Sequence, residues 1–364
     1  MQSDQISEMI DATSKMVERI SDKDLLEMKE MDERLHIFMN FYSLLATAAF
    51  FLNSDMLPFI ASRMVRLTMK NGLCTYSIVG FVQFAMVLLS SNNANNCVES
   101  ASRIGKAAMS CYRERYNTAY MSPALYSIYY GHIAFHTEPL HTCAVKLRQG
   151  FDAGMSLGES GMALFNAIQH IKTAFMAGHR LPTLLEKVDY YLEQENTYQN
   201  EFAKAYLSLF RGTISTLIDK GVSTSASPLA IDVPADTANA HLQESINFHR
   251  AIGAYWQGYS ERCQCYIGKL QINFNCVIIA SIHGMNSSRL LKSESSTKTR
   301  SISKKKLRSV LKNAIKVLKT AAIHSCWNFL NKVRYNQSVF DALFTSFTHY
   351  VSKFVPPSHG ILIP

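Results

Sequence analysis

The sequence is poor in turn-forming residues and contains few recognisable catalytic signatures. It has only nine prolines and 16 glycines in 364 residues. β-Sandwiches and barrels need a turn about every 8 to 12 residues, so this scarcity argues against both folds. No Walker-type phosphate loop, protein-kinase motif or His-Glu-x-x-His zinc motif occurs. We therefore nominate no catalytic residue and no cofactor, and we expect a protein that is not an enzyme.

The cysteines are typical of a protein from a reducing compartment. Eight cysteines are scattered along the chain, mostly in apolar segments, and none forms a Cys-x-x-Cys pair. Residues 1–31 are polar and acidic, which is unlike a secretory signal peptide. Both features predict a cytoplasmic protein with reduced, buried thiols.

Positive charge is concentrated near the C-terminal end. Residues 285–364 contain 14 Lys and Arg against 2 Asp and Glu, a net charge of +12. Residues 1–284 contain 23 against 26, a net charge of −3. A basic surface over the whole protein is thereby excluded, and we expect no specific nucleic-acid partner.

Much of the chain consists of apolar runs of about 15 to 20 residues that alternate with short polar breaks. Two runs with their breaks span about 40 residues, which is the period of a helix-turn-helix repeat. One such repeat cannot bury its apolar face alone, so neighbouring repeats must stack to make a core. The sequence therefore predicts an all-α fold: an antiparallel helix-hairpin solenoid, tetratricopeptide-like, wound as a right-handed superhelix.

Changes in composition divide the chain into segments. These are a helical lead-in (1–32), a helical-repeat array (33–220), a loop (221–237), continued helical repeats (238–283), a flexible basic loop (284–303), C-terminal helices (304–355) and a tail (356–364). Both loops lack apolar periodicity, and the second is rich in Ser, Lys, Thr and Arg. Within the continued repeats we expect two helices, 238–257 and 261–282.

Two stretches have the low charge of membrane spans. In residues 35–52, His36 is the only group that titrates near neutral pH, and residues 71–98 carry no formal charge. Both stretches also contain polar side chains, and a helix that is apolar all round can form the inner layer of a solenoid. We interpret both as buried solenoid helices. A membrane-associated helical protein is the alternative.

Some residue groups resemble chemical sites but fit ordinary packing better. A loose metal-ligand spacing joins His132, His136, His141 and Cys143. Pro139 interrupts the helix within that group. Cys263 and Cys265 are two apart in a helical segment and point to different faces. Residues 154–161 (GMSLGESG) lack the lysine of a phosphate loop, so a turn between helices is favoured. No metal site is predicted.

The sharpest local signal is a basic amphipathic helix at residues 304–322. Its apolar residues recur at offsets 0, 3, 4, 7, 8 and 11 from Leu307, which places them on one face. The cations on the other faces are the candidate partner-binding residues Lys305, Arg308, Lys312, Lys316 and Lys319. A docked helix with solvated lysines is one interpretation. The others are a nuclear-import or anionic-surface patch, and a helix offered to a groove-binding partner of the calmodulin kind.

Several segments resemble one class of protein. They are residues 59–72 (FIASRMVRLTMKNG), 136–158 (HTEPLHTCAVKLRQGFDAGMSLG), 165–185, 255–258 (YWQG) with Arg262, and 327–329 (WNF) with Lys332. These segments resemble the tetratricopeptide-like helical-repeat region of large hybrid signalling proteins. Such proteins carry a kinase-like domain, an ATPase module of the AAA or STAND kind, the repeat array, and often a GAF domain and a histidine kinase. The resemblance covers about residues 35–332, and it implies a fragment or relic of such a protein.

The residues and the resemblance together predict a non-catalytic scaffold for protein interaction or sensing. The resemblance implies the regulatory segment of a signal-transduction ATPase or kinase, with kinase or ATPase domains among its protein partners. The alternative is a part of a kinase or ATPase assembly that is active only with a partner chain. The family's kinase and ATPase motifs have no counterpart in this sequence, so neither activity is carried over to any residue.

Overall fold

The computed structural model describes residues 3–52, 54–90, 94–218, 240–270 and 304–325, together with 282, 285–287, 290 and 328. Over these residues the protein is helical, and its one β-type pairing is an isolated parallel bridge between Glu30 and Leu73. The predicted all-α fold is confirmed. The predicted loop 221–237 and tail 356–364 lie outside the described residues, as does nearly all of 326–355.

The first part of the chain forms helices that follow one another closely. They are α1 (Ser3–Glu18), α2 (Asp22–Leu26), α3 (Glu33–Phe51), α4 (Met56–Asn71), α5 (Thr75–Ser90), α6 (Ala94–Cys111) and the π-helical turn η1 (Tyr112–Tyr116). The middle part begins with a broken helix. It comprises η2 (Ala119–Met121), α7 (Ser122–Ile128), the π-helical turn η3 (Tyr129–Ile133) and η4 (Ala134–His136).

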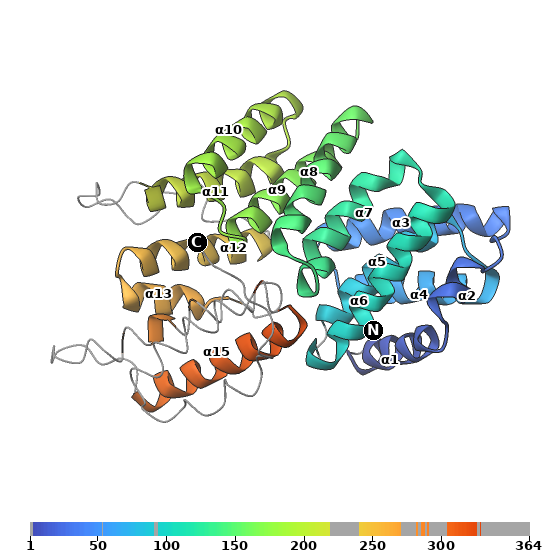
Figure 1. Ribbon diagram of the computed structural model, residues 1–364, viewed down its shortest axis with the longest axis horizontal. Helices are drawn as coiled ribbons and strands as arrows, with labels where there is room; N and C mark the ends of the chain where they lie inside the picture. The colour runs from blue at the N-terminus through green and yellow to red at the C-terminus, as the bar shows by residue number, and fades with distance from the viewer. Residues whose placement is uncertain are drawn as a thin grey trace, which may run out of the picture.

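Further helices make up the rest of the described chain. They are α8 (Leu140–Ser156), α9 (Ser160–Met176), α10 (Leu181–Tyr198), α11 (Glu201–Ile218), α12 (Ala240–Trp256), α13 (Ser260–Ile267) and α15 (Lys304–His324). Consecutive helices pack against each other, as in α4–α5, α5–α6, α8–α9, α10–α11 and α12–α13. Figure 1 shows α1–α6 at one end of the molecule, α8 and α9 in the middle, and α10–α13 at the other end.

One predicted helix is shorter than expected. The sequence predicts one helix over residues 261–282, but α13 ends at Ile267. The N–H of Gly268 donates to the Gln264 carbonyl oxygen, and the chain then turns. Within the predicted flexible loop 284–303, residues 285–287 are helical. There, Asn286 is buried and its Nδ2 donates to the Ser260 carbonyl oxygen at 2.9 Å.

Helix α9 lies in the middle of the array, in contact with α7, α8, α10 and α11. Its buried side chains include polar ones, which must find partners because an unpaired polar group in a core is costly. The Asn166 Nδ2 donates to the Pro123 carbonyl oxygen of α7 at 2.8 Å. The Gln169 Nε2 lies 3.1 Å from the His132 Nε2 of η3. These bonds fix how α7 and η3 lie against α9.

Close approach of α8 to α9 requires glycine. A Cβ added at Gly154 would lie 2.9 Å from the Ala163 Cβ and 3.0 Å from the Ala163 backbone nitrogen. A Cβ at Gly150 would lie 2.4 Å from the Asn166 Oδ1. These distances are shorter than packed atoms tolerate, so any larger residue would push the two helices apart.

Gly154→Ala tests this close approach. The new methyl group would meet the backbone of α9, which cannot move aside as a side-chain tip can, so we expect a loss of about 1–3 kcal/mol in the free energy of unfolding. Gly161→Ala is the matched control, because its Cβ meets nothing within 4 Å. There, alanine should stabilise helix α9 by up to about 1 kcal/mol. Urea denaturation curves measure both, and equal effects would contradict the packing.

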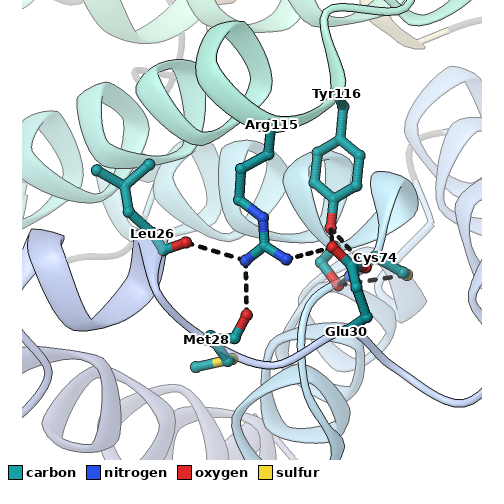
Figure 2. A network of polar contacts seen from close by, with 7 residues as sticks. Leu26, Met28, Glu30, Cys74, Arg115 and Tyr116 are labelled. Atoms are coloured by element: carbon teal, nitrogen blue, oxygen red, sulfur yellow. Dashed lines mark hydrogen bonds and ion pairs between the residues drawn. The ribbon is translucent and has the colours of Figure 1, made fainter.

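Arg115, in the turn η1, joins the N-terminal segment to the array. Figure 2 shows its guanidinium between the carbonyl end of α2 and the carboxylate of Glu30. The Nη1 donates to the carbonyl oxygens of Leu26 at 3.0 Å and Met28 at 2.6 Å, and the Nη2 pairs with Glu30. The Tyr116 hydroxyl donates to the same carboxylate at 3.1 Å. A cation is favourable at the carbonyl end of a helix, where backbone acceptors lack partners.

Arg103, on α6, does the same for helix α1. One guanidinium nitrogen donates to the Val17 carbonyl oxygen at 2.9 Å, and the other donates to the Asp22 carboxylate at 3.0 Å. The two arginines therefore hold the ends of α1 and α2 against α6 and η1.

The C-terminal part returns to the first half of the molecule. Helix α15 packs against α6, which is distant in the sequence. Its apolar face is buried at Leu307, Leu311, Ala314 and Leu318. Near the start of α8, the Asn328 Oδ1 accepts a hydrogen bond from the Leu140 N–H at 2.9 Å, and its Nδ2 donates to the Glu138 carbonyl oxygen at 2.8 Å. A linear solenoid, whose repeats contact only their neighbours, has no such return.

Leu311→Ala should therefore destabilise the protein. Leu311 is 0% exposed, and removing a buried leucine side chain leaves a cavity that costs about 2–5 kcal/mol. Ile323→Ala, on the same helix at a position 77% exposed, should change the free energy of unfolding by less than about 0.5 kcal/mol. Thermal and urea denaturation compare the two. A similar small change for both would mean that α15 does not contribute to the folded core.

Candidate functional site

Helix α3 exposes a row of large apolar side chains. Ile37 is 70% exposed and Leu44 is 64% exposed. The row, which we call the α3 outer face, consists of Ile37, Phe38, Phe41, Leu44 and Leu45. Their spacing places them on one side of the helix. Scattered exposed apolar residues are ordinary, but a contiguous row of this kind is typical of a binding surface.

The prediction that residues 35–52 form a buried helix is wrong for this outer side. Met39, Ala46 and Ala49 are buried in the cluster that α3 shares with α4. Helix α1, however, packs on α4, and the outer side of α3 stays uncovered. The corresponding prediction for residues 71–98 is confirmed over α5, which is buried from Ser77 to Leu88. When a helix is apolar all round, the packing of its neighbours decides which side is buried.

Helix α4, against which α3 packs, carries a row of exposed cations. Arg63, Arg66 and Lys70 are exposed, and the ion pairs between described residues include none of them. Arg63 and Lys70 each follow by three residues a side chain of the cluster shared with α3, Ile60 and Leu67. Residues three apart are neighbours on a helix surface, so these cations border the seam between α3 and α4.

A cavity of about 130 Å³ lies between α3, η3, α9, α11 and α12. Its wall is mostly aromatic, with the phenylalanines Phe50, Phe51, Phe165, Phe175, Phe202, Phe210 and Phe248. Neighbouring rings meet edge to face: the centroids of Phe51 and Phe165 are 5.2 Å apart at 72°, and those of Phe51 and Phe202 are 5.6 Å apart at 86°. This is the favoured geometry for aromatic pairs, and it makes a well-defined apolar wall.

Lys172 brings the one ammonium group into this wall. Its Nζ donates to the Gln169 Oε1 at 3.3 Å, and the Gln169 Nε2 lies 3.1 Å from the His132 Nε2. Burial lowers the pKa of Lys172 to about 8, because removal from water disfavours the charged form. The side chain still carries its proton at neutral pH.

Helices α11 and α12 supply other polar groups of the wall. Burial raises the pKa of Tyr206 to about 12; its hydrogen bond with Ser245 opposes this shift and the charge of Glu244 adds to it. The His249 Nδ1 lies 2.8 Å from the Thr213 Oγ1. Burial lowers the pKa of His249 to about 3, so its ring is neutral in the folded protein.

Two further histidines are neutral for the same reason. Burial lowers the pKa of His170 to about 3, with the charges of Lys187 and Arg148 adding to the shift, and its Nδ1 lies 2.7 Å from the Tyr191 hydroxyl. Burial lowers the pKa of His136 to about 4, and the charge of His324 adds to the shift. The folded protein thus holds several imidazoles that take up protons readily only when it unfolds.

The predicted partner-binding residues of α15 are only partly described. The helix forms as predicted and its apolar face is buried. Lys312 and Lys316 are exposed, while Lys319 is half-buried. The side chains of Lys305 and Arg308 lie outside the described residues. None of Lys312, Lys316 and Lys319 lines the cavity.

The residues with a metal-like spacing face different surroundings. His132 lies in the cavity wall, the His136 ring stacks on Phe135 at 4.3 Å, and His141 is exposed. Cys263 is buried and Cys265 is exposed, so they point to different sides as predicted. Across the described part of the chain, no three His, Cys, Asp or Glu side chains are placed to share a metal ion.

One catalytic-type spacing escaped the sequence analysis. Residues 154–158 read Gly-x-Ser-x-Gly, the pattern of a nucleophile elbow. That motif needs a strand before the serine and a helix after it. Ser156 instead ends helix α8, and its hydroxyl donates to the Ala153 carbonyl oxygen at 2.8 Å. Gly158, at φ +76°, then makes the turn into α9, as predicted for residues 154–161.

Comparison with known proteins adds no family. No family model matches the chain, and no curated protein or solved structure is significantly similar to it. Among the helices that the structure describes, none is both long enough and apolar enough to cross a bilayer.

The buried histidines predict a loss of stability in acid. Their folded pKa values of about 3 to 4 lie below the 6.5 of a solvated histidine, so the unfolded chain binds more protons between these limits. The stabilising contribution of these neutral histidines is fully present above about pH 6.5. As the pH drops towards 4, the free energy of unfolding falls by about 1.4 kcal/mol per pH unit for each such histidine. His249→Gln should lower this slope by about 1.4 kcal/mol per pH unit, which corresponds to one proton. His141→Gln, at an exposed position, should leave the slope unchanged. Urea denaturation between pH 4 and pH 8 measures the slopes, and identical slopes for wild type and His249→Gln would contradict the assignment.

Proposed function

We propose that this protein is a non-catalytic helical scaffold that binds an acidic amphipathic helix of a partner protein on the α3 outer face. The observation that carries the proposal is the row of exposed apolar side chains on α3. Amphipathic helices recognise such surfaces by placing their own apolar row against them, with anchors about three, four and seven residues apart.

Charge argues for the kind of partner. The exposed cations Arg63, Arg66 and Lys70 lie on α4, the helix against which α3 packs, and α4 has no acidic residue within the helix to balance them. Glutamates or aspartates beside the partner's apolar row would meet these cations. A second copy of this chain would bring the same cations into the interface, where like charges repel. An acidic helix is therefore favoured over self-association.

The wider architecture fits the proposal. Consecutive helices pack as neighbours, which supports a tetratricopeptide-like array. The right-handed winding and the link to a signal-transduction ATPase or kinase remain part of the proposal, and the link rests on the resemblance alone. In that setting the partner helix would belong to a kinase or ATPase domain.

The test uses two synthetic helical peptides with the same leucine row, one flanked by glutamates and the other by lysines. Fluorescence anisotropy with the full chain should show binding of the glutamate peptide only, weakening as salt is added. Leu44→Ser should reduce the affinity at least about tenfold. Leu157→Ser is the matched control, because Leu157 is an exposed leucine on the end of α8 and should have no effect.

Charge reversal separates the roles of α3 and α4. Arg66→Glu combined with Lys70→Glu should shift the preference from the glutamate to the lysine peptide. Binding that ignores Leu44→Ser would overturn the proposal. So would a dimer of the free chain that Leu44→Ser dissociates, or preferential binding to anionic vesicles, since either would assign the α3 outer face to another occupant.

A further inference from the structure

The aromatic cavity is a different site from the α3 outer face, although α3 contributes to both. Its volume of about 130 Å³ is too small for a nucleotide or a peptide. An apolar cavity of about 150 Å³ in a protein core is known to hold a benzene molecule. The space therefore suits a single six-membered ring with a small substituent.

The lining of the cavity favours a ligand that contains an aromatic ring. Phe50, Phe51 and Phe165 meet pairwise edge to face, with centroids 5.2 to 5.7 Å apart. A further ring can continue this arrangement by offering its edge to one of these faces. An aliphatic chain would gain the burial but not the edge-to-face attraction.

The Lys172 ammonium in the wall favours an anionic substituent on that ring. Lys172 is the wall's one ammonium group, and its Nζ has the neutral amide oxygen of Gln169 as a hydrogen-bond acceptor. No carboxylate of the described residues lies within ion-pair distance of it. A half-buried ammonium without a counter-ion is less favourable than a paired one, and an anion entering the cavity would supply the missing charge.

Glu244 does not fill this role. Its charge contributes to the pKa of Tyr206, whereas burial alone shifts the pKa of Lys172. Among the described residues, no ion pair joins the Glu244 carboxylate to Lys172. One cation in a mostly aromatic wall matches one negative charge and would leave a phosphate dianion poorly balanced.

We propose that this cavity is a binding site for a small aromatic monocarboxylate, with its ring among Phe50, Phe51 and Phe165 and its carboxylate on the Lys172 ammonium. The carboxylate forms a charge-assisted hydrogen bond with the Nζ, and Gln169 holds the ammonium in place. The ligand site stands independently of the docking function proposed for the α3 outer face.

The experiment uses benzoate as the probe and benzyl alcohol as its neutral counterpart. Ligand-observed NMR titrations of the full chain at pH 7 should give tighter binding of benzoate. Lys172→Met should weaken benzoate at least about tenfold and leave benzyl alcohol within about twofold. This variant should fold well, because it replaces a half-buried, unpaired charge with an apolar side chain of similar length. Lys204→Met, at an exposed lysine of α11, is the matched control and should change neither ligand.

The pH dependence gives a second readout. Benzoate affinity should be constant from pH 6.5 to 7.5 and fall as the pH rises through about 8, where Lys172 loses its proton. The other titratable groups of the wall are His132, Tyr206, Glu244 and His249. The pKa of Tyr206 is raised to about 12 and that of His249 is lowered to about 3, so neither changes charge near pH 8. Benzyl alcohol binding should not depend on pH over this range.

Two results would overturn the proposal: equal benzoate affinity in wild type and Lys172→Met, or no benzoate binding by wild type at millimolar concentration. Ile168→Trp fills the cavity from α9, and benzoate binding that survives this change would place the ligand elsewhere. Leu44→Ser separates the two proposals. This variant should bind benzoate as wild type does, even if the peptide experiment fails.

Discussion

The buried polar side chains of α9 set the arrangement of the middle of this protein. A helix enclosed on several sides can be packed in many rotations if it is wholly apolar, because hydrophobic contacts are not directional. Asn166, Gln169 and His170 remove that freedom, since each has a hydrogen-bond partner on a different neighbour: α7, η3 and α10. A rotation of α9 would break all three bonds at once and leave polar groups unpaired in the core.

The cavity follows from the same constraint. The rotation that satisfies Asn166 and Gln169 turns Phe165 and Lys172 towards α11 and α12. Bulky rings from α3 and α11 meet there, and their rigid planes do not fill the space between four helices completely. Helix α3 thus has two roles, with Phe50 and Phe51 in the cavity wall and Ile37 to Leu45 on the outer surface.

Local sequence patterns predicted the helices well and their surroundings less well. A long apolar run located α5 and apolar periodicity located α15. Of the six residues that the pattern assigned to the apolar face of α15, Leu307, Leu311, Ala314 and Leu318 are buried, while Val310 and Ile315 are half-buried. For α3 the pattern has no clear polar side, so only the packing of α1 on α4 decides which side stays exposed. The cavity also depends on contacts between distant segments. Its one local signal was Lys172, a single cation in the apolar run of α9.

The N-terminal helices show why the exposed row survives in a stable fold. Arg103 and Arg115 hold α1 and α2 by their carbonyl ends against α6 and η1, so these helices lie away from the outer side of α3. These directional, charge-assisted bonds, together with the packing of α1 on α4, fix the position of both helices. Since α3 is anchored through Met39 and Ala46 on its inner side, its outer face is presented on a rigid helix. A surface prepared in this way loses little conformational entropy when a partner binds.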